Sequence, residues 1–243
     1  MDKMIRLIAK EPGKTEYIEQ PKYVADADNV VVKTMRCGIC ATDISIMRGD
    51  AFFILDGRTK YPVEFGHEWA GIVTEVGPDV KDIKVGDHVI SDSGVSCGKC
   101  EACLNGEYNK CKNNRSLGTI NAWPGGFCEY MKFPERHIHK LPMELDWDNA
   151  ALIEPAAISY GGVLKAGVDS TKTVLVIGTG AIGMCAAAVA HHIGAKKVMV
   201  SGRTDFKLDI AKKIGADVVV NSTQKPLTDF IREECGEDGV DVI

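Results

Sequence analysis

Four cysteines lie close together in one short segment of the chain. Cys97, Cys100, Cys103 and Cys111 form a C-x2-C-x2-C-x7-C run whose other residues are mostly Gly, Lys, Glu and Asn. Such a segment cannot fold around an apolar core of its own. Four thiolates fill all four positions of a tetrahedral zinc, so this spacing predicts a structural zinc that holds the loop together. Disulfide pairs are the alternative, and a reducing cytosol argues against them.

Length and charge narrow the classes of protein to be considered. The chain has 243 residues, 45% hydrophobic content and a formal net charge of -5 at pH 7. This length allows two modest domains, each with a core of its own. A mild negative charge argues against nucleic acid or an anionic membrane as partner, because both favour a basic patch. Met1–Met4 offers no apolar export segment, so we expect a cytoplasmic protein.

The residue pattern changes near residue 155. Before it, β-branched runs such as Val30–Val32 and Ile72–Val76 alternate with turn signals, which predicts an all-β barrel or sandwich over residues 1–155. Over residues 156–243, strand-like and helix-like segments alternate, which predicts a parallel sheet with helical crossovers. The last strand-like run, Val240–Ile243, is the fourth of this sheet. Residues 146–166 are predicted to form a connecting helix that Pro155 interrupts.

A glycine-rich turn follows the first apolar strand of the second part. Gly178-Thr179-Gly180-Ala181-Ile182-Gly183 matches G-x-G-x-x-G, and its strand-turn-helix context indicates a dinucleotide site. Gly178 permits the tight turn, Gly180 lets a pyrophosphate approach the backbone, and Gly183 lets the helix pack on the strand. The N–H groups at the start of the helix, where Ala181 and Ile182 lie, favour phosphates. A glycine turn without a ligand is the alternative.

The end of the second strand of this part bears on the choice of coenzyme. An NAD site places an acidic residue there, on the ribose 2'-hydroxyl. This chain has Gly202-Arg203 instead, and no carboxylate occurs before Asp205. Arg203 offers a cation where a 2'-phosphate would lie, so we expect NADP to be preferred over NAD. A solvent-exposed arginine without a ligand is the alternative.

The first part carries a second set of residues of the metal-ligating types. Cys40 lies in Cys37-Gly38-Ile39-Cys40-Ala41-Thr42-Asp43, His67 and Glu68 follow Gly66, and Glu154 precedes Pro155. A catalytic zinc takes three protein ligands of mixed type and leaves one position for water or substrate. Spacing alone leaves open a buried thiol, a core histidine and solvated carboxylates. His88, His137 and His139 belong to no motif, so we assign them no function.

Taken in order, these motifs and Gly125-Gly126-Phe127 resemble the zinc-containing medium-chain alcohol dehydrogenases over the whole chain. With glutamate at position 154, the chain resembles the sorbitol, iditol and threonine dehydrogenase branch of this family. The resemblance implies an α/β fold with a GroES-like β-barrel catalytic domain, followed by the first half of a Rossmann doubly wound parallel sheet. It also implies Cys40 and His67 as zinc ligands, with Glu68 or Glu154 completing the set. Asp43 would orient His67, and Thr42 would hydrogen-bond the substrate hydroxyl.

The same resemblance implies hydride transfer between a secondary alcohol, a polyol or sugar alcohol, and NAD(P), with two zinc ions per chain. The parent protein would be a homo-oligomer, a dimer or tetramer. Ser45 stands where many relatives have a proton-relay histidine, so the proton would leave by another route. A full Rossmann sheet has six strands, so we expect a longer parent protein. The alternative is a zinc-stabilised fragment that catalyses nothing and binds adenine nucleotide weakly.

Overall fold

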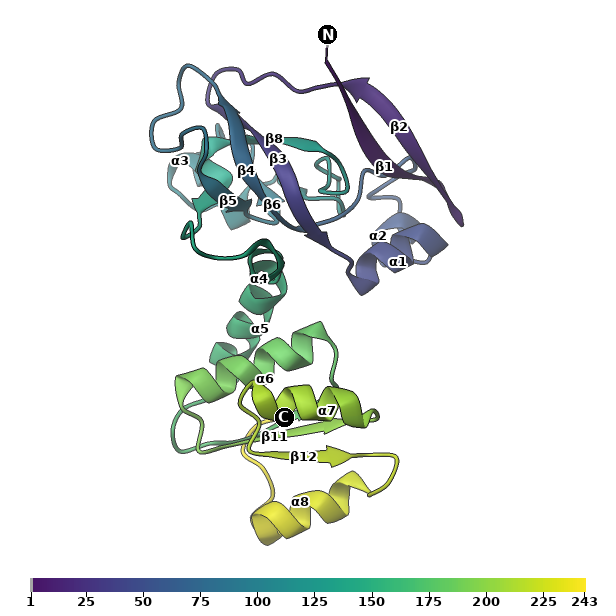
Figure 1. Cartoon of the computed structure of the whole chain (residues 1–243), viewed down its shortest axis with the longest axis vertical. Coiled ribbons are helices and arrows are strands. Elements are labelled where there is room, and N and C mark those ends of the chain that lie inside the picture. Colours follow the sequence, from purple (N-terminus) through teal and green to yellow (C-terminus); the bar gives the residue numbers. More distant parts are fainter. Residues whose placement is uncertain (1) are drawn as a thin grey trace. The chain divides into compact units, whose positions relative to one another are not determined.

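The computed structural model describes residues 2–243 (Figure 1). The described chain divides into two units, one that ends at Glu154 and one that spans Pro155–Ile243. Each unit has a buried hydrophobic core of its own. Within residues 2–243, every helix is too short or too polar to cross a membrane.

An antiparallel five-stranded sheet forms the centre of the first unit. Its strands, in spatial order, are β8 (Tyr130–Pro134), β3 (Asn29–Gly38), β4 (Glu68–Val76), β5 (His88–Ser91) and β9 (Ile138–Lys140). Val30, Val31 and Val32 of β3 are all fully buried, so both faces of this strand are covered. Val73 of β4 and Phe133 of β8 belong to the same core. The expected β-rich first part is therefore confirmed.

Shorter elements surround this sheet. Two antiparallel pairs accompany it, β1 (Lys3–Glu11) with β2 (Lys14–Pro21), and β6 (Gly94–Val95) with β7 (Arg115–Ser116). Helices α1 (Ala41–Arg48), α2 (Phe52–Leu55) and α3 (Glu101–Leu104) lie in the connections. Arg6 on β1 is almost fully buried, where it forms an ion pair with Glu64 at 2.8 Å and donates to the Gly125 carbonyl at 3.1 Å. The buried charge of Arg6 thus connects β1 to the segments that carry Glu64 and Gly125.

The predicted interruption of the connecting helix at Pro155 was wrong. The segment forms two helices, α4 (Trp147–Ala151) and α5 (Ile153–Lys165), and the break lies at Leu152. Pro155 lies in the first turn of α5, where the backbone N–H has no partner within the helix. Proline therefore costs no hydrogen bond at this position and is compatible with the start of a helix.

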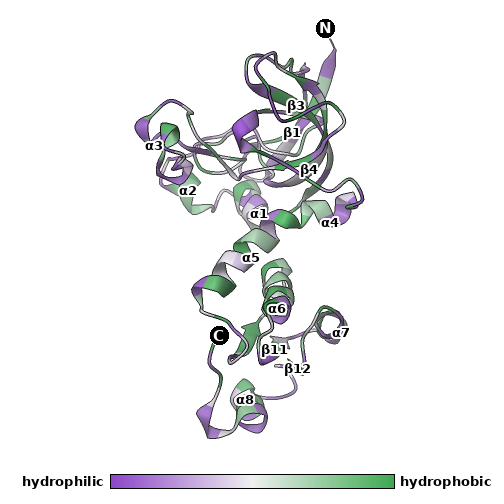
Figure 2. Ribbon diagram, turned by 90° about the vertical axis from the view of Figure 1, so that its left-hand side faces the viewer, coloured by the Kyte–Doolittle hydropathy of each residue, from purple (hydrophilic) through white to green (hydrophobic). Residues whose placement is uncertain are grey.

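A parallel sheet with helices on both faces forms the second unit. Its strands are β10 (Thr173–Ile177), β11 (Lys197–Gly202) and β12 (Val218–Asn221). Figure 1 shows α6 (Ala181–Ile193) and α7 (Asp205–Lys213) on one face and α8 (Leu227–Cys235) on the other. Two separate cores lie on these faces. In Figure 2, α6 is mostly hydrophobic, whereas α8 carries hydrophobic and hydrophilic residues in turn.

The fourth strand is shorter than the sequence predicted. Val240–Ile243 contributes one parallel bridge, between Val242 and Val174, and Leu175 N–H donates to the Val242 carbonyl at 2.8 Å. Gly239 has φ +72° after the short helix η3 (Gly236–Asp238), so the chain turns just before it reaches the sheet. Val242 therefore lies beside β10, on the side away from β11. The resulting order agrees with the first four positions of a 3-2-1-4-5-6 sheet.

Candidate active site and metal centres

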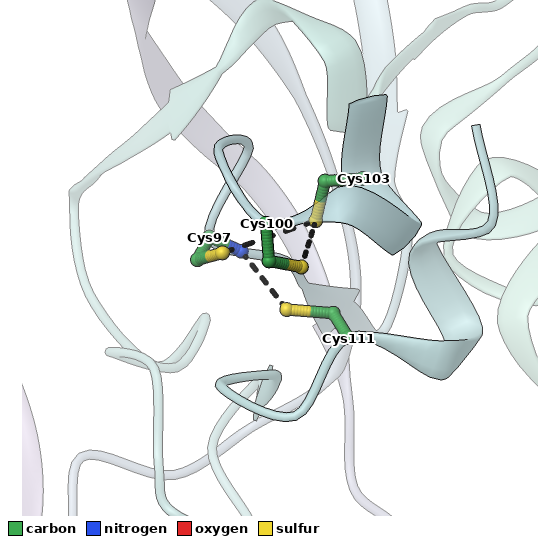
Figure 3. Close-up of side chains that lie close together, drawn as sticks. All are labelled: Cys97, Cys100, Cys103 and Cys111. Carbon is green, nitrogen blue, oxygen red and sulfur yellow. Dashed lines mark hydrogen bonds between the residues drawn. The ribbon is translucent and has the colours of Figure 1, made fainter. Parts of the chain in front are cut away.

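Four cysteine sulfur atoms meet in one loop of the first unit (Figure 3). The loop includes α3 and the short helix η1 (Tyr108–Lys110). All four sulfur atoms lie within 4.8 Å of one another, and Cys103 Sγ is 3.9 Å from Cys97 Sγ and 3.5 Å from Cys100 Sγ. Neighbouring sulfur atoms of a tetrahedral zinc centre are about 3.8 Å apart when the Zn–S bonds are about 2.3 Å. The four side chains therefore fit a tetrahedral metal ion.

The backbone of this loop favours the thiolate form that a metal requires. N–H groups of Lys99 and Cys100 hydrogen-bond the Cys97 sulfur and lower its pKa to about 6. The N–H of Cys97 donates in turn to Cys111 Sγ at 3.4 Å. The four cysteines are thiols rather than disulfides. A backbone N–H from Cys103 would lower the pKa of Cys100, but contact with the Cys103 thiol and burial raise it to about 11, so the backbone favours the thiolate at Cys97 in particular.

Cys40, His67 and Glu68 meet at one end of the central strand pair. Gly38 at the end of β3 lies opposite Glu68 at the start of β4, and Cys40 is the N-cap residue of α1. The ligand atoms of the three side chains lie within 4.8 Å of one another. A Cβ at Gly38 would lie 2.5 Å from Glu68 Oε2, so glycine leaves the space that this carboxylate occupies. The register of β3 and β4 thus brings Cys40 close to His67 and Glu68, which lie far from it in the sequence.

Asp43 connects the two segments that carry these residues. Its side chain is fully buried, and its carboxylate accepts hydrogen bonds from the backbone N–H of Cys40 at 2.9 Å and of Gly66 at 3.2 Å. His67 Nδ1 lies 3.7 Å from Asp43 Oδ1, too far for a hydrogen bond, and has no other partner among the described residues. Asp43 therefore places a negative charge beside the imidazole without a direct hydrogen bond to it.

The charges around His67 suit a cation. Burial would lower the pKa of His67, but contact with Asp43 and the negative charges of Asp43, Glu154 and Glu68 raise it above its usual value. Three carboxyl groups and a cysteine therefore surround one imidazole. A divalent metal ion would offset this concentration of negative charge, and Cys, His and carboxylate are ligands that zinc accepts.

Glu154 faces the same region but lies outside the group of ligand atoms. Its Oε1 accepts a hydrogen bond from the Ser93 hydroxyl at 3.0 Å. Burial raises the pKa of Glu154, while the Ser93 hydrogen bond and the charge of His67 oppose that rise. Of the two carboxylates that the sequence left open, the structure brings Glu68 to Cys40 and His67, and holds Glu154 on Ser93.

A cavity of about 420 Å³ opens beside these residues within the first unit. Thr42, His67 and Glu154 line it, and Phe52 and Phe53 of α2 supply an apolar wall. Cys40 Sγ lies 3.8 Å from Thr42 Oγ1. Leu117 and Ile120 also line the cavity, together with four hydroxyl and amide side chains, Ser93, Asn114, Ser116 and Thr119. Among the described residues, none of those that line the cavity is a lysine or an arginine.

The glycine-rich turn of the second unit borders another cavity, of about 380 Å³. Gly178 has φ +113°, a left-handed conformation that glycine favours. A Cβ at Gly183 would lie 2.1 Å from the Gly178 carbonyl oxygen, whereas a Cβ at Gly180 would meet no atom within 4 Å. Gly183 thus permits close packing of the helix, and Gly180 leaves open space where a phosphate can approach. Ala181 and Ile182 form the first turn of α6.

Arg203 lines this second cavity together with Gly202 and Ser222. The sequence analysis missed Lys207, which lines it as well. Lys207 lies on α7 (Asp205–Lys213), whereas Arg203 precedes that helix, so no local spacing in the sequence indicated that both side chains line one cavity. The cavity therefore has two cationic side chains at the end of β11.

Asp92 joins two histidines to which the sequence analysis assigned no function. His137 Nδ1 lies 2.9 Å from Asp92 Oδ2, and His139 Nε2 lies 2.7 Å from Asp92 Oδ1. His137 is fully buried, whereas His139 is exposed. The pairing depends on β5 and β9, in which Ser91 lies opposite Ile138. No local motif in the sequence indicates this contact.

The pair of Asp92 and His139 should make stability depend on pH. The hydrogen bond to Asp92 raises the pKa of His139; burial would raise the pKa of Asp92, but its two histidine partners lower it. A raised histidine pKa adds stability below about pH 6.5 that is lost as pH rises through the folded-state pKa. A lowered carboxyl pKa adds stability above about pH 3.9 that is lost as pH falls through the folded-state pKa.

We therefore expect the pair to contribute most between about pH 4 and about pH 6.5, and less than about 1 kcal/mol because His139 is exposed. The measurement is the difference in unfolding free energy between wild type and His139→Gln across pH. A difference that stays constant up to about pH 9 would contradict this expectation.

Known proteins resemble both parts of the chain. The family "Alcohol dehydrogenase GroES-like domain" matches residues 26–143, and the family "Zinc-binding dehydrogenase" matches residues 181–243. L-threonine 3-dehydrogenase of Pyrococcus horikoshii is 36% identical over 242 residues, which are 99% of this chain and 68% of that enzyme. The same enzyme of a Marinomonas species is 34% identical, and there the match covers 88% of this chain and 62% of the relative.

Solved structures resemble this chain as well. A protein of Sinorhizobium meliloti 1021, described as a zinc-binding dehydrogenase and bound to NADP, gives a TM-score of 0.82 at 31% identity, over 94% of this chain and 65% of that one. A short chain alcohol dehydrogenase of Escherichia coli CFT073 in complex with NADH gives 0.81 at 34% identity, over 96% of this chain and 66% of that one. These matches confirm the expected fold class. The chain spans about two thirds of the length of such relatives.

Proposed function

Because this chain belongs to the zinc-containing medium-chain alcohol dehydrogenase family, we propose that its protein oxidises a secondary hydroxyl of a neutral polyol with NAD(P). We assign the catalytic domain to residues 1–155 and the coenzyme-binding domain to residues 156–243. The observation that carries the proposal is the cavity of the first unit, where His67 and Thr42 adjoin a wall of hydroxyl and amide groups.

Cys40, His67 and Glu68 would hold the catalytic zinc, and Cys97, Cys100, Cys103 and Cys111 the structural zinc. Zinc supplies a Lewis acid that acidifies an alcohol hydroxyl, and the coenzyme supplies the hydride acceptor. Thr42 lies at the cavity wall beside Cys40, where its hydroxyl can accept a hydrogen bond from the substrate hydroxyl. Asp43 fixes the loop geometry around Cys40 and Gly66. Phe52 and Phe53 would offer an apolar surface to the carbon atoms of the substrate.

The polar lining supports a neutral polyol over an amino acid. Ser93, Asn114, Ser116 and Thr119 offer donors and acceptors that match vicinal hydroxyl groups. The carboxylate of L-threonine would lack a cationic partner, because among the described residues none that lines the cavity is a lysine or an arginine. An unpaired charge in such a site costs several kcal/mol.

A comparison of initial rates with different substrates tests this proposal. We expect initial rates with a panel of sugar alcohols and butanediols to give kcat/KM at least about a hundredfold above that for L-threonine, which corresponds to about 2.7 kcal/mol. A preference for L-threonine would contradict the polyol assignment. Coenzyme binding without turnover of any alcohol would favour the alternative of a zinc-stabilised, inactive fragment.

We also propose that the second unit prefers NADP, with Arg203 and Lys207 close to the 2'-phosphate. Arg203→Asp should weaken NADPH binding relative to NADH by at least about tenfold, about 1.4 kcal/mol, because a charge-assisted contact becomes a repulsion. Fluorescence titration of both coenzymes measures this ratio. Lys212→Asp, an exposed position on α7 outside the cavity, is the matched control and should leave the ratio unchanged. An unchanged ratio in Arg203→Asp would contradict the NADP preference.

A further inference from the structure

His137 connects Asp92 to the start of the four-cysteine loop. His137 lies on η2 (Glu135–His137), and its Nδ1 faces Asp92 at 2.9 Å. On the other side of the ring, Nε2 lies 3.0 Å from Ser96 N and 2.9 Å from Ser96 Oγ. A backbone N–H can only donate, so Nε2 accepts it and Nδ1 carries the proton that is donated to Asp92. The ring therefore has one defined tautomer and orientation.

Arg136 holds the same segment from the neighbouring position. Its guanidinium donates to the Ser96 carbonyl at 2.8 Å and forms an ion pair with Asp28 at 3.0 Å. It also lies over Gly98, which has φ +73° and where a Cβ would come within 2.8 Å of Arg136 Cζ. Two adjacent side chains of η2 thus bind the N–H and the carbonyl of Ser96, the residue immediately before Cys97.

The Ser96 hydroxyl contacts the same ring, with Oγ 2.9 Å from His137 Nε2. Asp92, His137 and Ser96 have the residue types of a hydrolase triad, but Ser96 is only 3% exposed. This serine is therefore not placed to attack a substrate.

We propose that His137 is a positioning residue for the metal at the four-cysteine loop, and that it slows release of the metal by holding the Ser96 backbone next to Cys97. This inference rests on the proposed structural zinc. Partners that position metal ligands commonly change metal affinity by about 10–100-fold when they are removed. The contact of His137 acts on the backbone from which the loop begins.

The same segment also borders the substrate cavity. Ser93 holds Glu154, and Gly94 of β6 lines the cavity together with Ser116 of β7. Residues 92–96 therefore connect Ser93, which binds the Glu154 carboxylate at the cavity, to Cys97, the first cysteine of the loop. A looser four-cysteine loop would free β6 and, with it, one wall of the cavity.

Metal release tests the proposal directly. The parent protein for this experiment carries Cys40→Ser, so that the metal at the four cysteines is the one expected to remain. The zinc-loaded protein is mixed with excess chelator and a metallochromic dye. We expect His137→Gln in this background to release zinc about tenfold faster than the parent. His139→Gln is the matched control, because His139 binds the same Asp92 carboxylate but does not reach Ser96. It should release zinc at the parental rate.

A spectroscopic test separates positioning from general loss of stability. With Co²⁺ in place of zinc, we expect His137→Gln to shift the thiolate-to-metal charge-transfer band, because the backbone before Cys97 is no longer held. Ser96→Ala keeps the backbone N–H bond to His137 and should keep the parental band and release rate. Where His137→Gln does not fold, Arg136→Gln removes the contact with the Ser96 carbonyl instead and should give the same shift. Parental release rates together with a parental cobalt spectrum in these position-136 and position-137 variants would overturn the proposal. A parent that binds no metal at the four cysteines would instead refute the structural zinc itself.

Discussion

Cys40→Ser is expected to abolish alcohol oxidation while the four-cysteine metal and the fold remain. Serine keeps the shape of the side chain but offers no thiolate, so the group of Cys40, His67 and Glu68 loses its anionic sulfur ligand. Loss of Lewis-acid stabilisation worth several kcal/mol lowers kcat by at least about a thousandfold. The measurement pairs steady-state kinetics on the best polyol with metal content, which should fall by one ion per chain.

Cys37→Ser is the matched control for this experiment. Cys37 lies three residues earlier, and burial raises the pKa of its thiol, so it stays protonated. Its sulfur packs against Gly66 and Gly126, where an added Cβ on either glycine would come within 3.1 Å. We expect this variant to keep its metal and most of its activity. Full turnover in Cys40→Ser would show that the zinc assignment is wrong, and loss of turnover in Cys37→Ser would indicate a thiol pair instead.

Asp43→Asn is expected to weaken both the fold and the metal site. The Asp43 carboxylate accepts the N–H groups of Cys40 and Gly66, whereas an amide can accept only one and turns its NH2 group toward the other. An unpaired buried donor costs about 1–3 kcal/mol, and the lost charge removes the partner of His67. We expect a fall in unfolding free energy of about 2 kcal/mol and at least about tenfold weaker zinc binding at the active site.

Denaturant unfolding and competitive zinc titration measure these two effects. Asp50→Asn makes the same chemical change at an exposed position just after α1, and it should alter neither quantity. If Asp43→Asn matched wild type in both, the carboxylate would have no role in holding Cys40 and His67.

Local motifs were predictable from the sequence because their geometry is local. The spacing of Cys97, Cys100, Cys103 and Cys111 indicated a shared centre, and the structure brings the four sulfur atoms together. The glycines of the dinucleotide turn also have the predicted geometry, since Gly178 adopts positive φ and Gly183 lies against the Gly178 carbonyl. In both cases a few consecutive turns determine the arrangement.

Long-range contacts were harder to predict. Cys40 meets His67 and Glu68 only through the register of β3 and β4, so their spacing left the ligand set open. The resemblance suggested Cys40 and His67 but did not choose between Glu68 and Glu154. The contact of Asp92 with His137 and His139 depends on the pairing of β5 with β9 and had no motif to indicate it. Side-chain identity alone carries no information about such pairings.

Two local predictions failed because context outweighed propensity. Pro155 was expected to interrupt a helix, yet it lies in the first turn of α5, where its missing N–H has no effect. The β-branched run Val240–Ile243 was expected to form a strand, but Gly239 turns the chain and one bridge forms. Lys207 was missed because Arg203 lies before α7, so helical spacing does not relate the two residues.

The most direct test of the central claim is the number of zinc ions per chain, measured by elemental analysis of protein purified without chelator or added metal. Two zinc ions are predicted, one at the four cysteines and one at Cys40, His67 and Glu68. One zinc ion, unchanged in Cys40→Ser, would leave only the four-cysteine loop metallated and would contradict the proposed dehydrogenase site in this chain.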